Sequence, residues 1–294
     1  MVEGLLGLQA NLAFFNLSQT LGAIMFFSDL ALSRRVETAN AVSSAKMADL
    51  YAQKYPQSQA ATLAIAGGHA IYLGDNSPLT QALGMGLQET VSVSEIEELE
   101  DFYYRKNSAV NIELSPLVEP ALLELLGTRG YHLVEVSNVL IKRLDKSNLL
   151  KLSAPEVEIS TVDTSTINDW ANTVIKGFGA EGEFADMLNA VWQTGFCIPD
   201  NYFFLARIDN NCAGGGGIFI YENVASLSGA STLPEFRKLG VQNKLLQHRL
   251  NLAIELGCDL AVISTLPGTI SQRNSERQGF QVAYTRVKLM RPKA

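Results

Sequence analysis

The pattern of apolar positions divides the C-terminal part of the chain into short strands and amphipathic helices. Alternating runs predict strands, and apolar residues three or four apart predict helices. The expected elements are a strand over 157–163, helices over 167–178 and 184–194, and three consecutive antiparallel strands over 202–208, 213–221 and 225–232. Asp209-Asn210-Asn211 fits a hairpin turn between the first two of these three strands.

The clearest helix in the chain is expected over 241–256. Its apolar residues Val241, Leu245, Leu252 and Leu256 are predicted to share one side. Gly257 follows directly and is predicted to end the helix.

Both halves of the chain end in the same series of elements. The second half ends in a strand over 260–264, a helix over 269–278 and a strand over 280–290; the first half ends in a strand over 109–114, a helix over 118–129 and a strand over 131–144. Gly130-Tyr131 matches Gly279-Phe280 at an offset of 149 residues. This offset predicts the duplication of a whole domain. A polar stretch over 145–155 fits a linker, so we expect domains over 1–150 and 151–294.

Composition limits the classes of protein that the chain fits. Its 294 residues are 47% apolar, enough for about two globular domains. A net charge of −7 is unfavourable for binding nucleic acid. The three cysteines show no disulfide, redox or metal-ligand spacing, which favours a cytoplasmic protein without a metal. The apolar stretch over 12–27 is interrupted by polar residues and predicts a buried helix, not a membrane segment.

The charge is unevenly divided between the halves. Residues 1–150 hold 10 basic and 16 acidic side chains, whereas residues 151–294 hold 13 basic and 14 acidic ones. A site for a polyanionic cofactor is therefore expected in the nearly neutral second half.

One loop in that half has the features of a phosphate-binding site. Arg237 and Lys238 come directly before the helix expected over 241–256, and Gly240 lets a ligand approach the backbone. A helix N-terminus adds free N–H groups and the positive end of the helix dipole. The loop therefore predicts a pyrophosphate cradle. An ordinary strand–helix turn with solvated charges is the alternative.

The matching place in the first half has the opposite charge. Five carboxylates gather there, at Glu95, Glu97, Glu98, Glu100 and Asp101, and would repel a diphosphate. Ser94 and Glu97 have the spacing of a capping box, which is a structural device. We therefore expect no cofactor site in the first half.

These residues resemble the GNAT superfamily of coenzyme A-dependent N-acetyltransferases. The resemblance rests on Arg237-Lys-Leu-Gly240-Val-Gln242, the lead-in Pro234-Glu235-Phe236, and the later Gly279-Phe280. It covers about 156–291, and the first half resembles a degenerate second copy, as in tandem GNAT proteins. The resemblance implies an α/β (α+β) fold of two GNAT-like domains, each with a mixed, mostly antiparallel sheet flanked by helices.

The resemblance also implies acetyl-CoA as acyl donor, with no metal. The backbone of Ser231, Thr232 and Leu233 would bind the pantetheine arm, and the loop residues Arg237, Lys238, Leu239, Gly240, Val241 and Gln242 would bind the pyrophosphate. The thioester would lie in a wedge where the strand ending at Thr232 separates from the strand that begins at Leu260. A neutral amine would attack it directly, with a general base and a general acid moving the protons.

Two positions depart from the family pattern. Gln242 stands where Gly or Ala is usual, and Ser275 stands where a tyrosine commonly acts as the acid. A serine hydroxyl is a poorer proton donor, so Tyr284 is the substitute to test; a packed aromatic is the alternative.

The remaining candidate groups are acidic residues and a glycine run. Glu222 is the nearest candidate base, although an exposed turn residue is the alternative. Glu181 and Glu183, with Asp186 nearby, could bind a cationic amine or complement a helix dipole. The run Gly214–Gly217 could leave room for substrate or allow a bulge.

The preferred function is acetyl transfer to a primary amine of a small molecule or a peptide. Neither nucleic acid nor membrane is an expected partner, and a homodimer is compatible with the sequence. A non-catalytic acyl-CoA-binding or regulatory module is the alternative, and a different acyl group is a third possibility.

Overall fold

The computed structural model describes residues 27–75, 77–147 and 149–293. The helix predicted over 12–27 therefore lies outside the described residues, except for Phe27, which is not helical and is exposed. Within the described ranges, no helix combines the length and the apolar character needed to cross a membrane.

The described part of the first half begins with a long helix, continues with three consecutive strands, and then alternates between helix and strand. Its elements are α2 (Leu30–Lys54), the short 3-10 helix η1 (Pro56–Ser58), β1 (Ala61–Ile65), β2 (Gly68–Tyr72), β3 (Gln81–Leu83), α3 (Val93–Tyr104), β4 (Val110–Leu114), α4 (Pro120–Thr128) and β5 (His132–Arg143).

The second half repeats the end of this order and adds a pair of helices before it. Its elements are β6 (Glu158–Thr161), α5 (Ile167–Phe178), α6 (Gly182–Gly195), β7 (Asn201–Ile208), β8 (Asn211–Tyr221), β9 (Val224–Thr232), the 3-10 helix η2 (Pro234–Phe236), α7 (Val241–Glu255), β10 (Leu260–Thr265), α8 (Ile270–Arg277) and β11 (Gln281–Arg291). The predicted hairpin is confirmed, because Asp209 and Asn210 both have positive φ between the antiparallel strands β7 and β8.

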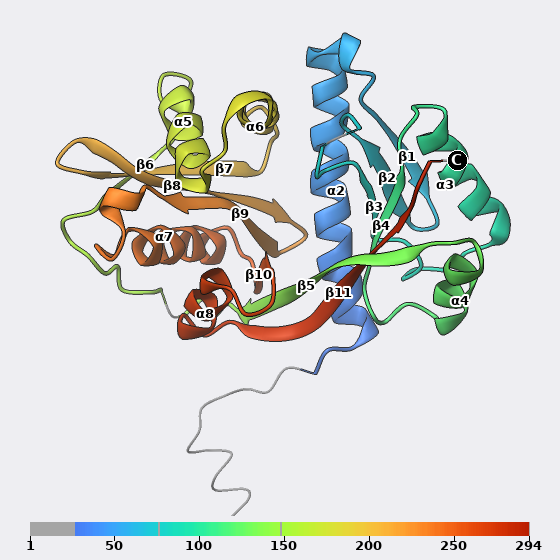
Figure 1. Ribbon diagram of the computed structural model, residues 1–294. Helices are drawn as coiled ribbons and strands as arrows, with labels where there is room; N and C mark the ends of the chain where they lie inside the picture. The colour runs from blue at the N-terminus through green and yellow to red at the C-terminus, as the bar shows by residue number, and fades with distance from the viewer. Residues whose placement is uncertain (1–26, 76, 148, 294) are drawn as a thin grey trace, which may run out of the picture.

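All described strands form one sheet in the order β1-β2-β3-β4-β11-β5-β10-β9-β8-β7-β6. Most neighbouring strands are antiparallel; β3 with β4 and β9 with β10 are parallel. Helices flank this sheet, and α2 stands between the two groups of strands (Figure 1). The mixed, mostly antiparallel sheet flanked by helices confirms the predicted fold class.

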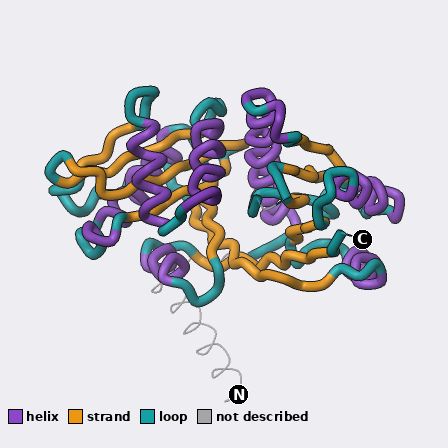
Figure 2. The backbone as a smooth tube through the Cα atoms, turned by 45° about the horizontal axis from the view of Figure 1, so that its top comes forward, coloured by secondary structure: helices purple, strands orange, loops and turns teal. Residues whose placement is uncertain are grey.

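The last strand of each half is inserted into the other half. β11 lies between β4 and β5, and β5 lies between β11 and β10. The two long strands run side by side and bridge the two lobes of the molecule (Figure 2). Neither half therefore has a complete sheet without a strand from the other.

The pairing of β5 with β11 is symmetric. Gln281 pairs with Ile141, and Met290 pairs with His132. Gln281 stands 149 positions after His132, and Met290 stands 149 positions after Ile141. Each of the two pairs is therefore the repeat-equivalent of the other. Two repeated units related by a twofold axis would have this register. The domain boundary near residue 150 stays a prediction.

A buried polar cluster fastens α2 to the exchanged strand β11. Glu37 on α2 accepts hydrogen bonds from the Tyr284 hydroxyl (2.7 Å) and from Arg286 Nε (2.8 Å). Arg286 Nη1 also lies 3.3 Å from a Glu113 carboxylate oxygen and donates to Ser264 Oγ at 2.8 Å. Burial works to lower the pKa of Arg286, but Glu37 and Glu113 outweigh it and raise that pKa. The guanidinium is thus charged, and it joins β11 to three other elements, α2, β4 and β10.

Removing this guanidinium should destabilise the whole molecule. Breaking a buried ion pair from one side costs about 3–5 kcal/mol, because the remaining carboxylates stay buried without a cationic partner. We expect Arg286→Met to lower the free energy of unfolding by about that amount in urea denaturation. Arg35→Met removes the exposed pair with Asp259 and should cost less than about 1 kcal/mol. Equal losses in the two variants would contradict the role given to the cluster.

Candidate functional site

The parallel strands β9 and β10 separate partway along their length. They pair only from Val224 to Ser226 on β9, opposite Leu260 to Val262 on β10. Beyond these residues β9 continues beside β8 to Thr232, and β10 continues beside β5 to Thr265. The facing edges of the two strands are unpaired there, so the backbone can accept a ligand as an added strand.

Two buried hydroxyls lie along this opening. Thr232 Oγ1 at the end of β9 and Thr265 Oγ1 at the end of β10 are both buried and have no hydrogen-bond partner. Buried polar groups are nearly always paired, so such orphans fit a ligand with hydrogen-bonding groups.

The loop after β9 leads directly into the N-terminus of α7. Its N-cap is Gly240, with φ of 84°, and no side chain caps the helix. Lys244 N–H is the amide that bonds back to Gly240 O, which leaves the preceding amides of the first turn without helical acceptors. Arg237 and Lys238 are exposed beside these amides. The loop therefore offers N–H donors, a helix dipole and two cations to an anion.

The linker between the halves packs against this loop. Lys244 Nζ donates to Ala154 O at 2.9 Å. A Cβ on Gly240 would lie 2.7 Å from Ala154 Cβ, so the close approach requires glycine as well as the positive φ.

The matching helix in the first half has its N-terminus closed by its own side chains. Ser92 Oγ accepts from Glu95 N–H, and Glu95 Oε2 accepts from Ser92 N–H at 2.7 Å. The predicted capping box of Ser94 and Glu97 was therefore wrong by two residues, because both serines have a glutamate three positions later. Glu100 is also occupied, since Arg129 and Arg291 both bind its carboxylate.

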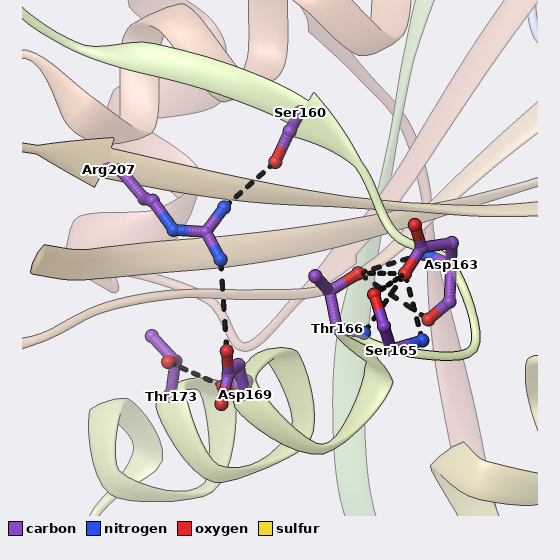
Figure 3. Close-up of polar contacts among 7 residues, drawn as sticks. All are labelled: Ser160, Asp163, Ser165, Thr166, Asp169, Thr173 and Arg207. Carbon is purple, nitrogen blue, oxygen red and sulfur yellow. Dashed lines mark hydrogen bonds and ion pairs between the residues drawn. The ribbon is translucent and has the colours of Figure 1, made fainter. Parts of the chain in front are cut away.

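Helix α5 packs against β8 and β9. Asp163 Oδ1 accepts hydrogen bonds from the N–H and hydroxyl groups of Ser165 and Thr166, as Figure 3 shows, and these bonds lower the pKa of Asp163 to about 2. Further along α5, Val174 O accepts from Ser231 Oγ at 3.2 Å. This bond ties α5 to the end of β9.

The glycine run of β8 makes room for protein side chains. A Cβ on Gly215 would lie 2.7 Å from Trp170 Nε1, and one on Gly216 would lie 2.9 Å from Arg249 Cζ. These side chains fill the space that the sequence left open for substrate. The bulge alternative is confirmed, since the β8–β9 register shifts between Gly215 and Gly217.

The buried side of α7 differs from the predicted stripe. Val241 and Leu245 are buried as expected, but Leu256 is 44% exposed and lies just past the helix. Arg249 is instead in the buried stripe, 2% exposed. Apolar periodicity could not find it, because a charged residue is normally assigned to the solvent side.

The predicted proton donors already bond to protein acceptors. Ser275 is buried on α8, and its hydroxyl donates to Ser271 O at 3.0 Å. Tyr284 donates to Glu37, and burial, with Glu37 second, raises the pKa of its hydroxyl. Either hydroxyl would have to give up its present bond before it could reach a ligand.

The predicted acidic residues are all exposed and lie apart from one another. Glu222 is in the turn before β9, at the paired end of the strands and not at the opening. Glu181 and Glu183 are at the N-terminus of α6, where they complement the helix dipole. The structure thus gathers the predicted cofactor residues at one place but does not gather the catalytic candidates. No cluster of metal-binding side chains is found among the described residues.

Residues 167–280 match the model of the Acetyltransferase (GNAT) family, so this part of the chain is a GNAT domain. No curated protein matches the chain in sequence.

Similar solved structures share the fold at low identity. A GCN5-related N-acetyltransferase from Kribbella flavida is 18% identical with a TM-score of 0.60, over 85% of this chain and 96% of that one. A tandem GNAT protein from the clavulanic acid biosynthesis pathway is 12% identical with a TM-score of 0.56, over 77% of this chain and 78% of that one. A functionally unknown conserved protein from Staphylococcus epidermidis is 15% identical with a TM-score of 0.52, over 69% and 80%. The likeness to the tandem GNAT protein therefore shows a shared fold over 77% of this chain.

The packing role of the glycine run can be tested by adding a methyl group. We expect Gly215→Ala to lower the free energy of unfolding by about 1–3 kcal/mol, because the site is already filled by Trp170. Gly127→Ala, in open space on α4, should raise it by about 0.5–1 kcal/mol through helix propensity. If urea denaturation gives the same free energy of unfolding for Gly215→Ala as for the wild type, the space beside Gly215 is free. The interpretation that the glycine run leaves room for substrate would then be favoured.

Proposed function

We propose that the second half binds acetyl-CoA and transfers the acetyl group to a primary amine of a small molecule or peptide. One observation carries the proposal: in a GNAT domain, an uncapped helix N-terminus with Arg237 and Lys238 stands next to an open strand edge. The helix N-terminus supplies N–H donors and positive charge to a diphosphate. The open strand edge supplies backbone hydrogen-bonding groups to an extended amide chain.

The cofactor residues of the proposal follow the order of the chain. The backbone of Ser231, Thr232 and Leu233 would bind the pantetheine amides through groups that β8 leaves free, since Leu233 N–H already donates to Ala213 O at 2.9 Å. The amides of Lys238, Leu239, Gly240, Val241 and Gln242 would bind the pyrophosphate with Arg237 beside them, and Arg237 Nε also donates to Thr232 O at 3.4 Å. Bound acetyl-CoA supplies an activated thioester for acyl transfer.

The chain's own residues must then position an amine and move two protons. An N–H on the open edge of β9 would polarise the thioester carbonyl, which is the oxyanion-hole effect. The attacking amine loses a proton to a base, and the departing thiolate gains one from an acid. Exposed Glu181 and Glu183 would attract a cationic acceptor toward α6 by charge. Among Ser275, Tyr284 and Glu222, the geometry gives the least support to Glu222, which lies at the paired end of the strands.

We further propose that residues 1–150 bind no acetyl-CoA. At the N-terminus of their α3, the Ser92–Glu95 capping box binds the N–H groups of Ser92 and Glu95 and places the Glu95 carboxylate there, which is unfavourable for a diphosphate. Their contribution would be structural, through β5 and α2. A cytoplasmic location and a homodimer stay predictions.

The second candidate is a non-catalytic acyl-CoA-binding module. It is favoured by the engagement of both hydroxyl donors, Ser275 with Ser271 and Tyr284 with Glu37.

Calorimetric titration with acetyl-CoA tests the binding proposal. We expect one site per chain, and at least a tenfold weaker affinity in Arg237→Glu because a cation becomes an anion beside the pyrophosphate. Arg105→Glu makes the same charge change at the exposed C-cap of α3 in the first half and should leave the affinity unchanged. No binding by the wild type, or equal loss in both variants, would refute the site.

Release of free CoA thiol over a panel of primary amines separates the two candidate functions. We expect amine-dependent release that rises with pH as the acceptor ammonium loses its proton. A chain that binds acetyl-CoA but releases no thiol with any amine would support the binding module and count against the enzyme.

A further inference from the structure

Arg249 is a buried cation that donates its hydrogen bonds to backbone carbonyls. It is 2% exposed on α7. Its Nε donates to Leu245 O at 3.1 Å, and its Nη1 donates to Gly217 O at 3.0 Å and lies 3.5 Å from Ser228 O. No carboxylate within the described part of the chain forms an ion pair with it.

A buried arginine that bonds to neutral carbonyls lowers the stability of the fold. Burial of a charge without an ionic partner is unfavourable, and desolvation lowers the pKa of Arg249 to about 10. The group is still charged at neutral pH. An apolar side chain of similar length would fill the same space on α7 without this cost.

The carbonyls that Arg249 reaches belong to the bulge between β8 and β9. Gly215 pairs with Ser231 and Gly217 pairs with Ser228, so Gly229 and Ala230 lie opposite the single residue Gly216. Gly229 has a φ of 58°. A bulge interrupts the ladder hydrogen bonds, and Arg249 supplies donors there. Gly216 must be glycine because the guanidinium lies where its Cβ would be.

This bulge is in the open part of β9, three residues past the last pair with β10. Ser228 O lies 3.6 Å from the position that a Cβ on Gly217 of β8 would take, so the Ser228 carbonyl is directed toward β8. Arg249 Nη1 lies near both Gly217 O and Ser228 O at this place. In a planar trans peptide the N–H points opposite to the C=O. The Gly229 N–H is therefore directed toward the side where β10 has separated.

We propose that Arg249 is a positioning residue that holds the Ser228–Gly229 peptide and strengthens the Gly229 N–H as a donor to the thioester carbonyl. The inference rests on the proposed acetyl-CoA site. A carbonyl that accepts from a cation polarises its own peptide, which makes the attached N–H a stronger donor. Arg249 itself neither gives nor takes a proton. Its charge acts through the peptide, on the oxygen that becomes negative in the transition state.

Isotope-edited infrared spectroscopy of acetyl-CoA labelled at the thioester carbonyl tests this directly. In the bound wild type we expect the carbonyl stretch below that of free acetyl-CoA. In Arg249→Met it should return toward the free value. We expect kcat to fall at least about tenfold, because donors of this kind act mainly in the transition state. The Kd for CoA, which has no thioester, should change less than about threefold in the same variant.

Two further variants complete the design. Arg249→Lys keeps the charge but lacks the separate Nε donor that binds Leu245 O and fixes the side chain. It should therefore shift the carbonyl stretch and kcat part of the way, and it tests the inference if Arg249→Met does not fold. Arg207→Met removes an arginine of β7 that binds Ser160 and Asp169, and it should leave both readouts unchanged. Wild-type stretch and kcat in the folded Arg249 variants would overturn the inference. Failure of the wild type to bind acetyl-CoA would instead refute the proposed function.

Discussion

The antiparallel pairing of β5 with β11 is the interaction on which the rest of the structure depends. It joins two incomplete sheets into one, and it places the last strand of each half between two strands of the other. The free energy of folding of each half therefore includes backbone hydrogen bonds that the other half supplies. The polar cluster of Glu37, Tyr284 and Arg286 reinforces the same junction from the α2 side.

The candidate site is a consequence of this pairing. β10 is held along its whole length by β5, whereas β9 is held by β8, and the two parallel strands pair over only three residues. Because each strand is anchored on its far side, the opening between them does not depend on a ligand. Preorganised donors are what transition-state stabilisation requires. Arg249 holds the backbone of the bulge in place in the same way, because ladder hydrogen bonds are missing there.

Much of the local structure could be predicted from the sequence. The helix expected over 167–178 is found at Ile167–Phe178, and the three consecutive strands that follow α6 lie within two residues of the expected bounds. Periodicity is strong there and each element has a clear end. The capping box was displaced because Ser92 and Ser94 both satisfy the same spacing, and only the backbone conformation at Ser92 chooses between them.

Long-range features could not be predicted in the same way. β5 and β11 have similar patterns, so no periodicity indicates that they exchange partners. The hydrogen bond from Tyr284 to Glu37 joins residues 247 positions apart. The burial of Arg249 could not be predicted because a charged residue is normally expected on the solvent side of a helix. The loop over 237–242 could be proposed as a site from the sequence because its chemistry is local: cations, a glycine and a helix start lie within six residues.

Hydrogen exchange of the intact chain, with and without CoA, tests the central claim most directly. An asymmetric site predicts slower exchange of the amides over 227–233 and 238–243 when CoA is bound, with the matching segment over 84–95 unchanged. Protection of the segment over 84–95, or no protection at either place with CoA in excess, would contradict the account.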